Sequence, residues 1–306
     1  MVKKTKQLKK TKTISRKKAD LNIILLNYNA QFWLRKTLAS LKKFYLDKTK
    51  YRIEVTVVDN DSNDGSPAMV AKEFRWAKLI KSGGNVGFSA GNNIALKQST
   101  ARYTMLLNSD TEFHHGSNLD ILIDYLDDNP QVGMITPRVE LPDGSLDQAS
   151  HRGEPTPWAS LTYFSGLAKI FPKSSFLSRY HLTFKNLNEI HEIDCCTGAA
   201  MIFPTKFMQD KVGLLDERFF MYAEDLDWCR RFREAGKKII FHPGVQLTHH
   251  KYKSGIKSSS SRLSKKIHNM FYDTMLMYYD KWYAEKYPKF FRTILRYFLF
   301  IKKGGL

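Results

Sequence analysis

Polar side chains follow four successive apolar segments of the chain, at the points where those segments end. They are Asn27, Asn29, Asp59, Asn60, Asn108 and Asp110, with a glycine-rich stretch from Gly83 to Asn93 between the second and fourth groups. Taken singly, each fits a turn or a helix cap, because Asn, Asp and Gly favour both. Four such groups instead predict a nucleotide site, since parallel sheets bind ligands at the carboxyl ends of their strands.

The glycine-rich stretch offers four further candidates for ligand binding. They are Asn85, Gly87, Asn92 and Asn93. Asn85 stands where a dinucleotide fingerprint needs a glycine, and no GxxxxGK sequence occurs, so a Rossmann dehydrogenase and a P-loop NTPase are both disfavoured. A glycine turn that opens a helix can still present backbone N–H groups to a diphosphate.

Asp110 is the first candidate metal ligand. It follows an apolar segment, where a carboxylate can hold a divalent cation that bridges two phosphates, and oxygen ligands suit Mg²⁺ or Mn²⁺. One carboxylate does not make a tight site. Asn108 and a histidine from the pair His249 and His250 are candidate partners, although such a pair also fits surface or packing roles.

Three acids lie close together in the aromatic segment Phe219 to Arg231. Glu224, Asp225 and Asp227 fall at the expected start of a helix, where acids also stabilise the helix dipole. Acids beside aromatic side chains equally suit a general base, whose proton affinity is set by burial and by neighbouring charges. Both interpretations stand at this point.

Short apolar runs alternate with amphipathic stretches along the chain, which predicts crossover units and a mostly parallel sheet flanked by helices. Strands are predicted over residues 21–26, 53–58, 103–108, 132–136, 196–204 and 237–243, and helices over 31–44, 69–74, 89–98, 119–126 and 224–236. The fold class is therefore α/β, and it brings the polar groups above to one edge of the sheet.

The net charge of +19 is concentrated at the two ends of the chain. Residues 1–18 hold nine Lys or Arg and no acid, residues 251–306 hold thirteen against three acids, and residues 19–250 hold 27 of each sign. We predict a disordered basic tail over 1–18, a catalytic domain over 19–255 and a basic, aromatic helical extension over 256–306. Residues 137–194 lack clear periodicity and are predicted to be an insertion or an acceptor-facing segment.

Other classes are disfavoured by composition. The three cysteines match neither a disulfide framework nor a zinc site, which indicates a reducing compartment. The sequence shows no signal peptide and no apolar run long enough to span a bilayer, so we expect a soluble or surface-bound protein. No motif for reading RNA or DNA accompanies the basic ends, so we expect no nucleic-acid partner.

The ordered set of motifs resembles the family 2 glycosyltransferases, and within them the rhamnosyltransferase-like group of bacterial polysaccharide synthesis. The matching pieces are NYN, VDNDSNDGS, NVGFSAGNN, LLNSD, CTGAAMIFP, LLDERFFMYAEDLDWCRRFREAG and HPGVQLTHH, spread over residues 21 to 250. The resemblance implies a GT-A fold, a nucleoside-diphosphate sugar donor, a divalent metal and inversion at the anomeric carbon. It also implies a saccharide or lipid-linked acceptor.

The resemblance assigns roles to individual residues. Asp59 is similar to the acid that contacts the nucleotide base, helped by Asn27 and Asn29, and residues 85–93 to donor-binding groups. Asp110 is similar to the last residue of the DxD metal motif, His249 to the late metal-proximal histidine, and Asp225, next to Glu224, to the catalytic base. Asn108 departs from the motif, which has an acid at this position. An amide there should weaken metal affinity.

We therefore expect an inverting glycosyltransferase that moves a sugar, rhamnose from a dTDP donor, onto its acceptor in polysaccharide synthesis. One alternative keeps the fold and transfers a hexose or N-acetylhexosamine from a UDP donor. Another, from a different class, is a non-catalytic polyanion binder, suggested by the charge of +19.

The aromatic, basic residues 267–301 have two interpretations. They fit helices lying in the headgroup region of an anionic membrane, which predicts a cytoplasmic protein peripheral on the inner face of the plasma membrane. They also fit helices that pack on the catalytic domain or form a homodimer interface.

Overall fold

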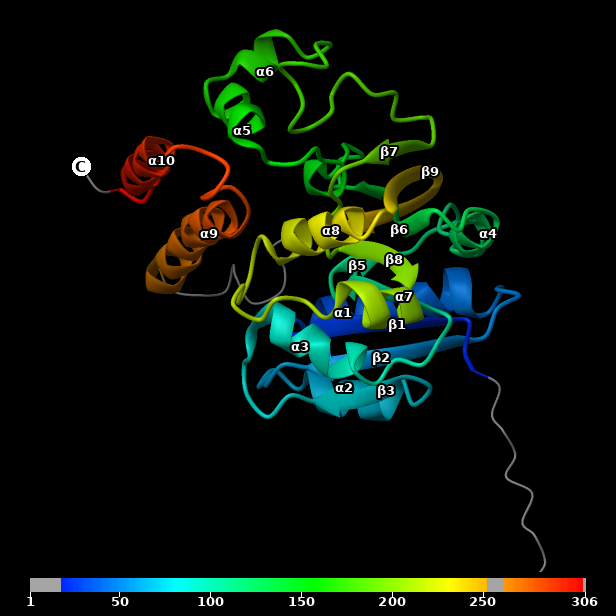
Figure 1. The fold of residues 1–306 in the computed structure, drawn as a ribbon. Helices are drawn as coiled ribbons and strands as arrows, with labels where there is room; N and C mark the ends of the chain where they lie inside the picture. The colour runs from blue at the N-terminus through cyan, green and yellow to red at the C-terminus, as the bar shows by residue number, and fades with distance from the viewer. Residues whose placement is uncertain (1–17, 252–260, 305–306) are drawn as a thin grey trace, which may run out of the picture.

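The computed structural model describes residues 18–251 and 261–304 (Figure 1). The basic tail predicted over residues 1–18 lies outside this part of the chain, apart from Lys18. Nine strands of the described residues form one mixed sheet in the order β3-β2-β1-β4-β8-β6-β9-β5, with β7 paired to β9. Helices cover the sheet on both sides.

The first half of the sheet is parallel. It consists of β1 (Leu21–Asn27), β2 (Ile53–Asp59), β3 (Lys78–Lys81) and β4 (Tyr103–Asn108), joined through α1 (Gln31–Leu41), α2 (Ser66–Glu73) and α3 (Gly87–Leu96). A five-residue π-helical segment, Lys42–Leu46, extends α1. Strand β1 lies between β2 and β4 and is buried on both faces, which agrees with the continuous apolar run at residues 23–26. Consequently the polar ends of β1, β2 and β4 meet at one edge, as predicted.

The second half of the sheet is mixed. Strand β8 (Ala200–Pro204) runs antiparallel to β4 and to β6 (Val132–Glu140), whereas β6 and β9 (Lys238–His249) are parallel. The short strands β5 (Thr111–Glu112) and β7 (His191–Ile193) pair antiparallel with β9. The helices of this half are α4 (Asp120–Asp128), α7 (Thr205–Phe207), which continues as a π-helical turn over Met208–Val212, and α8 (Glu224–Glu234).

The segment between β6 and β8 forms a lobe above the sheet (Figure 1). It contains a 3-10 turn at Gln148–Ser150, α5 (Pro157–Phe164), α6 (Leu167–Ile170) and β7. The chain enters this lobe through Gly153, where a side chain would collide with the Arg179 carbonyl oxygen, 2.0 Å from the Cβ position. Glycine is required there because the two backbones are in direct contact.

The C-terminal extension consists of α9 (Ser261–Trp282) and α10 (Lys289–Lys302). Helix α9 packs beside α8 through buried polar contacts. Glu154, from the lobe, accepts hydrogen bonds from Tyr278 (2.5 Å) and Tyr283 (2.7 Å) of the extension and forms an ion pair with Arg230 of α8 (2.9 Å). Packing on the catalytic domain, one of the two interpretations of the extension, therefore applies to α9.

A second buried acid joins α8 to α9 beside this cluster. Asp227 of α8 is fully buried and accepts a hydrogen bond from the Trp282 indole at 2.9 Å. The Lys281 ammonium lies 2.6 Å from the same carboxylate. No helix within residues 18–251 and 261–304 is both long and apolar enough to cross a bilayer.

Candidate active site

Two strained residues deliver the acids at the start of α8. Tyr222 and Ala223 have φ angles of 74° and 65°, in the left-handed region that non-glycine residues seldom occupy. Each costs on the order of 1–2 kcal/mol of backbone energy. The turn places Glu224 and Asp225 as the first two residues of α8, both buried. Strain of this kind clusters at functional sites, where the surrounding fold maintains it.

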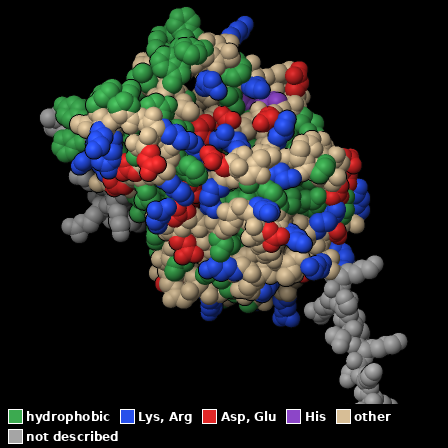
Figure 2. Space-filling view, viewed as in Figure 1, with side chains coloured by type: hydrophobic (Ala, Val, Ile, Leu, Met, Phe, Trp, Pro, Cys, Tyr) green, Lys and Arg blue, Asp and Glu red, His purple; other side chains and the backbone are tan. Residues whose placement is uncertain are grey.

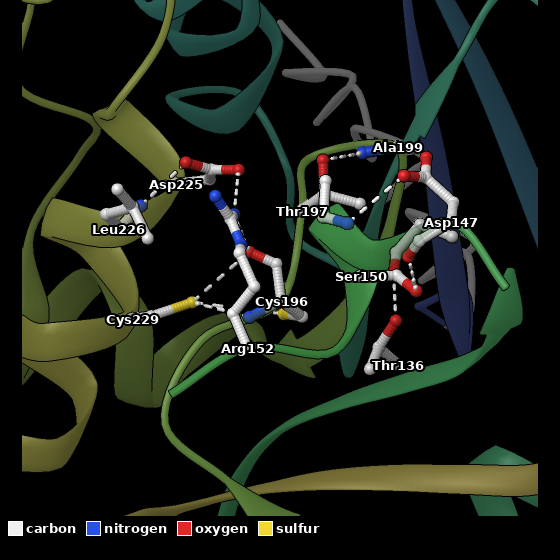
Figure 3. A network of polar contacts seen from close by, with 12 residues as sticks. Thr136, Asp147, Ser150, Arg152, Cys196, Thr197, Ala199, Asp225, Leu226 and Cys229 are labelled. Atoms are coloured by element: carbon white, nitrogen blue, oxygen red, sulfur yellow. Dashed lines mark hydrogen bonds and ion pairs between the residues drawn. The ribbon is translucent and has the colours of Figure 1, made fainter. Parts of the chain in front are cut away.

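Asp225 is held by an arginine from the lobe (Figure 3). The Arg152 guanidinium lies 2.7 Å from Oδ2 of Asp225, and the two side chains are only 10% and 12% exposed. Arg152 also donates to the Cys196 carbonyl, while the other Asp225 oxygen accepts the Leu226 N–H. Burial lowers the pKa of Arg152, but the charge of Asp225 opposes this effect, and the net pKa is raised. The guanidinium therefore stays charged.

Backbone pairing brings Arg152 to this position. Arg152 forms an antiparallel bridge with Cys195, and the Arg152 N–H donates to the Cys195 carbonyl. The next residue but one, Glu154, belongs to the cluster between α8 and α9. The lobe is thus attached to α8 at two points, one on each side of Gly153.

Glu224 differs in chemistry from its neighbour. Burial, followed by the charge of Asp225, raises the pKa of Glu224 to about 8. Its Oε2 atom has no hydrogen-bond partner among the described residues. Burial therefore favours the protonated form of Glu224, whereas Asp225 has an arginine as counter-ion.

Asp110 and His249 meet at the end of β4. Nε2 of His249 lies 3.2 Å from Oδ1 of Asp110 and 3.2 Å from the Asn108 amide nitrogen. On the other side of the ring, Nδ1 lies 2.9 Å from Oδ2 of Asp147. Burial lowers the pKa of His249, but hydrogen bonds to Asp110 and Asp147 outweigh this and raise it to about 9.

This donor set fits a divalent cation. A carboxylate behind a ligand histidine fixes the ring so that its other nitrogen faces the metal, and Asp147 occupies that position. No group of three or more His, Cys, Asp or Glu side chains placed to hold a metal occurs in the described ranges. Asn108 supplies an amide next to Asp110 and His249 in place of a further carboxylate.

The second histidine of the pair faces away from Asp110. Nε2 of His250 lies 2.7 Å from Glu112, and its ring packs on Trp33 with centroids 4.4 Å apart. The alternation of side chains along β9 separates the two rings, so His249 lies beside Asp110 and His250 lies beside Glu112.

The predicted base-binding residues lie together at the ends of β1 and β2. Asn27 and Asp59 are direct partners across the two strands, and both are buried. Ser62 donates its backbone N–H to Asp59 and accepts from the Asn27 amide and the Asn29 N–H. Oδ1 of Asn27 and Oδ1 of Asp59 have no hydrogen-bond partner among the described residues. Two buried acceptors therefore lie at the edge of the sheet where β1 and β2 end.

The loop before α3 is organised by Asn60. Its side chain donates to Asn85 and to the Gly87 carbonyl and accepts the Val86 N–H. Gly87 has a φ of 86°, and a side chain there would meet Phe220 at 2.6 Å. Asn60, Asn85 and Gly87 therefore shape the loop that opens α3 and connect it to the turn before α8.

Asn92 and Asn93 bond within the protein interior. The Asn92 amide donates to the Phe88 carbonyl, one turn earlier in α3. Asn93 donates to the Leu215 carbonyl and accepts the Leu215 N–H. The Asn92 amide thus stabilises α3, and the Asn93 amide joins α3 to the segment before α8.

Two residues that contact predicted site residues were not predicted. Arg152 and Asp147 lie in the segment without clear periodicity, and they meet partners 73 and 102 positions away in the chain. No local pattern marks them. The only available signal was that this segment contains charged residues close to the end of a predicted strand.

Known structures define the class of this fold. The mannosyltransferase PcManGT from Pyrobaculum calidifontis, solved with GDP-Man and Mn²⁺, superposes with a TM-score of 0.55 at 16% identity, covering 92% of this chain and 70% of that one. S. aureus TarS (residues 1–349) superposes with a TM-score of 0.53 at 17% identity, covering 84% of this chain and 65% of that one. The expected GT-A glycosyltransferase fold is thereby confirmed.

The sequence comparisons identify the family. The model of glycosyl transferase family 2 matches residues 22–204, so the chain belongs to this family. It is 25% identical over 255 residues to the N-acetylglucosaminyl-diphospho-decaprenol L-rhamnosyltransferase of Mycobacterium tuberculosis, with 80% of each chain covered. It is 24% identical over 289 residues to the low-salt glycan biosynthesis hexosyltransferase Agl10 of Haloferax volcanii, covering 86% of this chain and 83% of that one. The predicted similarity to the rhamnosyltransferase-like group is confirmed.

Proposed function

We propose that the protein transfers rhamnose from a dTDP donor, with inversion, onto a saccharide or lipid-linked acceptor in surface polysaccharide synthesis. The observation that carries the proposal is the arrangement at α8, where a strained turn and a buried arginine hold the Asp225 carboxylate in place. The similarity to the mycobacterial rhamnosyltransferase supports the choice of sugar.

In this mechanism Asp225 acts as the general base. As the acceptor hydroxyl oxygen attacks the anomeric carbon, its proton passes to the Asp225 carboxylate. The bond from that carbon to the diphosphate oxygen breaks, and the nucleoside diphosphate leaves with the electron pair. Arg152 orients the carboxylate, and the protonated Glu224 beside it adds no second negative charge.

The donor half of the site lies across the ends of β1, β2 and β4. Asn27 and Asp59 would offer acceptor oxygens to the nucleotide base. The loop of Asn60, Asn85 and Gly87 would lie beside the diphosphate, with its shape fixed by the Val86 and Gly87 N–H groups, which donate to Asn60 and Asn85. Asp110, His249 and Asn108 would hold Mg²⁺ or Mn²⁺. When bound, such a cation neutralises charge on the leaving diphosphate.

The proposal is tested with a panel of sugar nucleotides, with donor-dependent release of the nucleoside diphosphate as the readout. We expect turnover with dTDP-rhamnose and Mg²⁺ or Mn²⁺, and none in excess chelator. Asp225→Asn should lower transfer at least about a hundredfold, because the proton acceptor is lost, while donor binding is kept because the donor-binding residues are unchanged. Asp128→Asn, at the end of α4, is the matched control and should transfer normally.

Two outcomes would contradict parts of this proposal. Turnover with a UDP-hexose or UDP-N-acetylhexosamine, but not with dTDP-rhamnose, would favour the second candidate, which the similarity to the Haloferax hexosyltransferase supports. Normal transfer by a folded Asp225→Asn protein would reject Asp225 as the base.

A further inference from the structure

Large apolar side chains are exposed on the lobe and on the C-terminal helix. On α5, Trp158, Leu161 and Phe164 recur every third residue and are 38%, 58% and 39% exposed, whereas Ala159 and Thr162 on the other face are buried. The following residues add further exposed apolar side chains: Leu167, Ile170, Phe171 and Phe176. A face of this kind needs a partner, because soluble proteins seldom expose large contiguous apolar patches.

Helix α10 exposes its apolar face in the same manner. Phe290, Ile294, Tyr297 and Ile301 recur at helical spacing and are between 41% and 61% exposed. Leu299, on the opposite face of the helix, is buried against the protein. One side of α10 thus packs on the protein, and its outward side exposes large apolar side chains.

The two exposed faces form one surface. The rings of Phe164 in α5 and Phe298 in α10 are 5.0 Å apart, although the residues are far apart in the sequence. Figure 2 shows hydrophobic side chains gathered over α5 and α6 at the top and over α10 at the left, with Lys and Arg among them. We call this the α5–α10 surface.

The two segments that form the α5–α10 surface contain only basic charges, and one of these, Arg292 of α10, is paired with Asp280 of α9. Residues 155–188 contain four Lys or Arg and no acid, and residues 289–302 also contain four and no acid. Lys169, Lys173 and Arg296 are exposed. A second copy of the chain seated on this surface would bring like charges together, whereas an anionic lipid surface would complement them.

We propose that the α5–α10 surface docks on an anionic lipid bilayer, with its aromatic and aliphatic side chains in the headgroup region and its cations against lipid phosphates. Helices with an apolar face beside Lys and Arg bind membranes in this orientation, parallel to the surface. The sequence had indicated only residues 267–301 and the basic tail for such contact. The structure adds α5 and α6, and α5 begins five residues after Arg152.

The docking surface also bears on the acceptor, a step that rests on the proposed function. Arg152 and Glu154 connect the lobe to α8, so the lobe would contact the bilayer through α5 and α6 and Asp225 through Arg152. A lipid-linked acceptor would then reach the base without leaving the membrane. Binding to vesicles is measured without any sugar donor, so its failure and the failure of the proposed activity are separate results.

The test is flotation of the full chain with vesicles of phosphatidylcholine alone or with phosphatidylglycerol. We expect flotation with the anionic vesicles, little with phosphatidylcholine alone, and a loss at 0.5 M salt because charge attraction is screened. Leu161→Gln combined with Ile294→Gln removes one exposed apolar side chain from each half and should lower binding at least about tenfold. Lys169→Gln with Arg296→Gln should lower it in anionic vesicles only.

Matched control variants come from other surfaces of the chain. Ile121→Gln on α4 removes an exposed apolar side chain, and Lys72→Gln with Arg75→Gln removes two exposed cations. Both should float like the unmodified chain, and thermal unfolding checks that all variants are folded. No flotation at low salt, or flotation unchanged by both α5–α10 variants, overturns the proposal. A dimer in sedimentation that Leu161→Gln with Ile294→Gln dissociates, without any vesicle binding, overturns it in favour of a second copy.

Discussion

The ion pair between Arg152 and Asp225 makes a quantitative prediction about stability. Both side chains are nearly buried, so removing either charge leaves the other without its counter-ion in a poorly solvated place. Arg152→Met and Asp225→Asn should each lower the free energy of unfolding by about 3–5 kcal/mol, the usual cost of breaking a buried pair. The double variant should lose less than the sum, because it leaves no unpaired charge.

The coupling between the two changes is the quantity to measure. We expect a double-mutant cycle to give a coupling energy of about 2–3 kcal/mol, near the upper end of the range for residues in direct contact. Urea unfolding followed by tryptophan fluorescence suits the measurement, because Trp228 is buried in α8, three residues after Asp225. The exposed pair Arg35 and Glu73, 42% and 39% exposed, is the control and should couple far more weakly.

Additive costs for Arg152→Met and Asp225→Asn would refute the reasoning. They would mean that the two charges are solvated separately and that Arg152 does not orient the carboxylate. A third variant, Arg152→Lys, tests geometry, because an ammonium keeps the charge but loses the planar guanidinium, whose Nη2 atom donates to both Asp225 and the Cys196 carbonyl. It should recover part of the stability and less of the transfer rate.

Two further predictions concern the acids around the site. Burial raises the pKa of Glu224 to about 8 in the folded protein, above the ordinary 4.5. Between these two values the folded protein keeps a proton that the unfolded chain releases. The free energy of unfolding should therefore fall as the pH rises from about 5 to 8. Glu224→Gln should remove that slope in thermal unfolding; a constant difference in melting temperature from pH 5 to 8.5 would contradict it. Asp147→Asn should weaken Mn²⁺ binding by about 10–100-fold, because Asp147 orients His249, and direct titration with Mn²⁺ measures it. Unchanged affinity would show that Asp147 has no role at the metal.

Strands β1, β2 and β4 were predictable from sequence because they are largely buried, whereas β3, with partly exposed residues, and the short strands β5 and β7 were not predicted. The apolar runs at residues 21–26, 53–58 and 103–108 match β1, β2 and β4 within one residue at each end. The pattern failed in the lobe, where Pro157–Phe164 forms a helix whose apolar face points outward. An exposed apolar face and a core face look the same in a sequence, so its orientation could not be inferred.

The candidate site was predictable where it depends on strand ends and not where it depends on long-range pairing. Asn27 and Asp59 are neighbours because β1 and β2 are parallel, which the alternation of elements implies. Arg152 reaches Asp225 only because the lobe folds back along Cys195, and nothing near Arg152 in the chain indicates that path. Such contacts are decided by the tertiary fold.

The cluster around Glu154 changes how the C-terminal helices should be regarded. One carboxylate serves three parts of the chain, the lobe, α8 and α9, and each part supplies charges or hydroxyls that the others need. A related protein could not exchange its extension for another without also changing Glu154 and Arg230. The lobe, α8 and the extension are therefore expected to vary together during evolution, although they are separate segments of the chain.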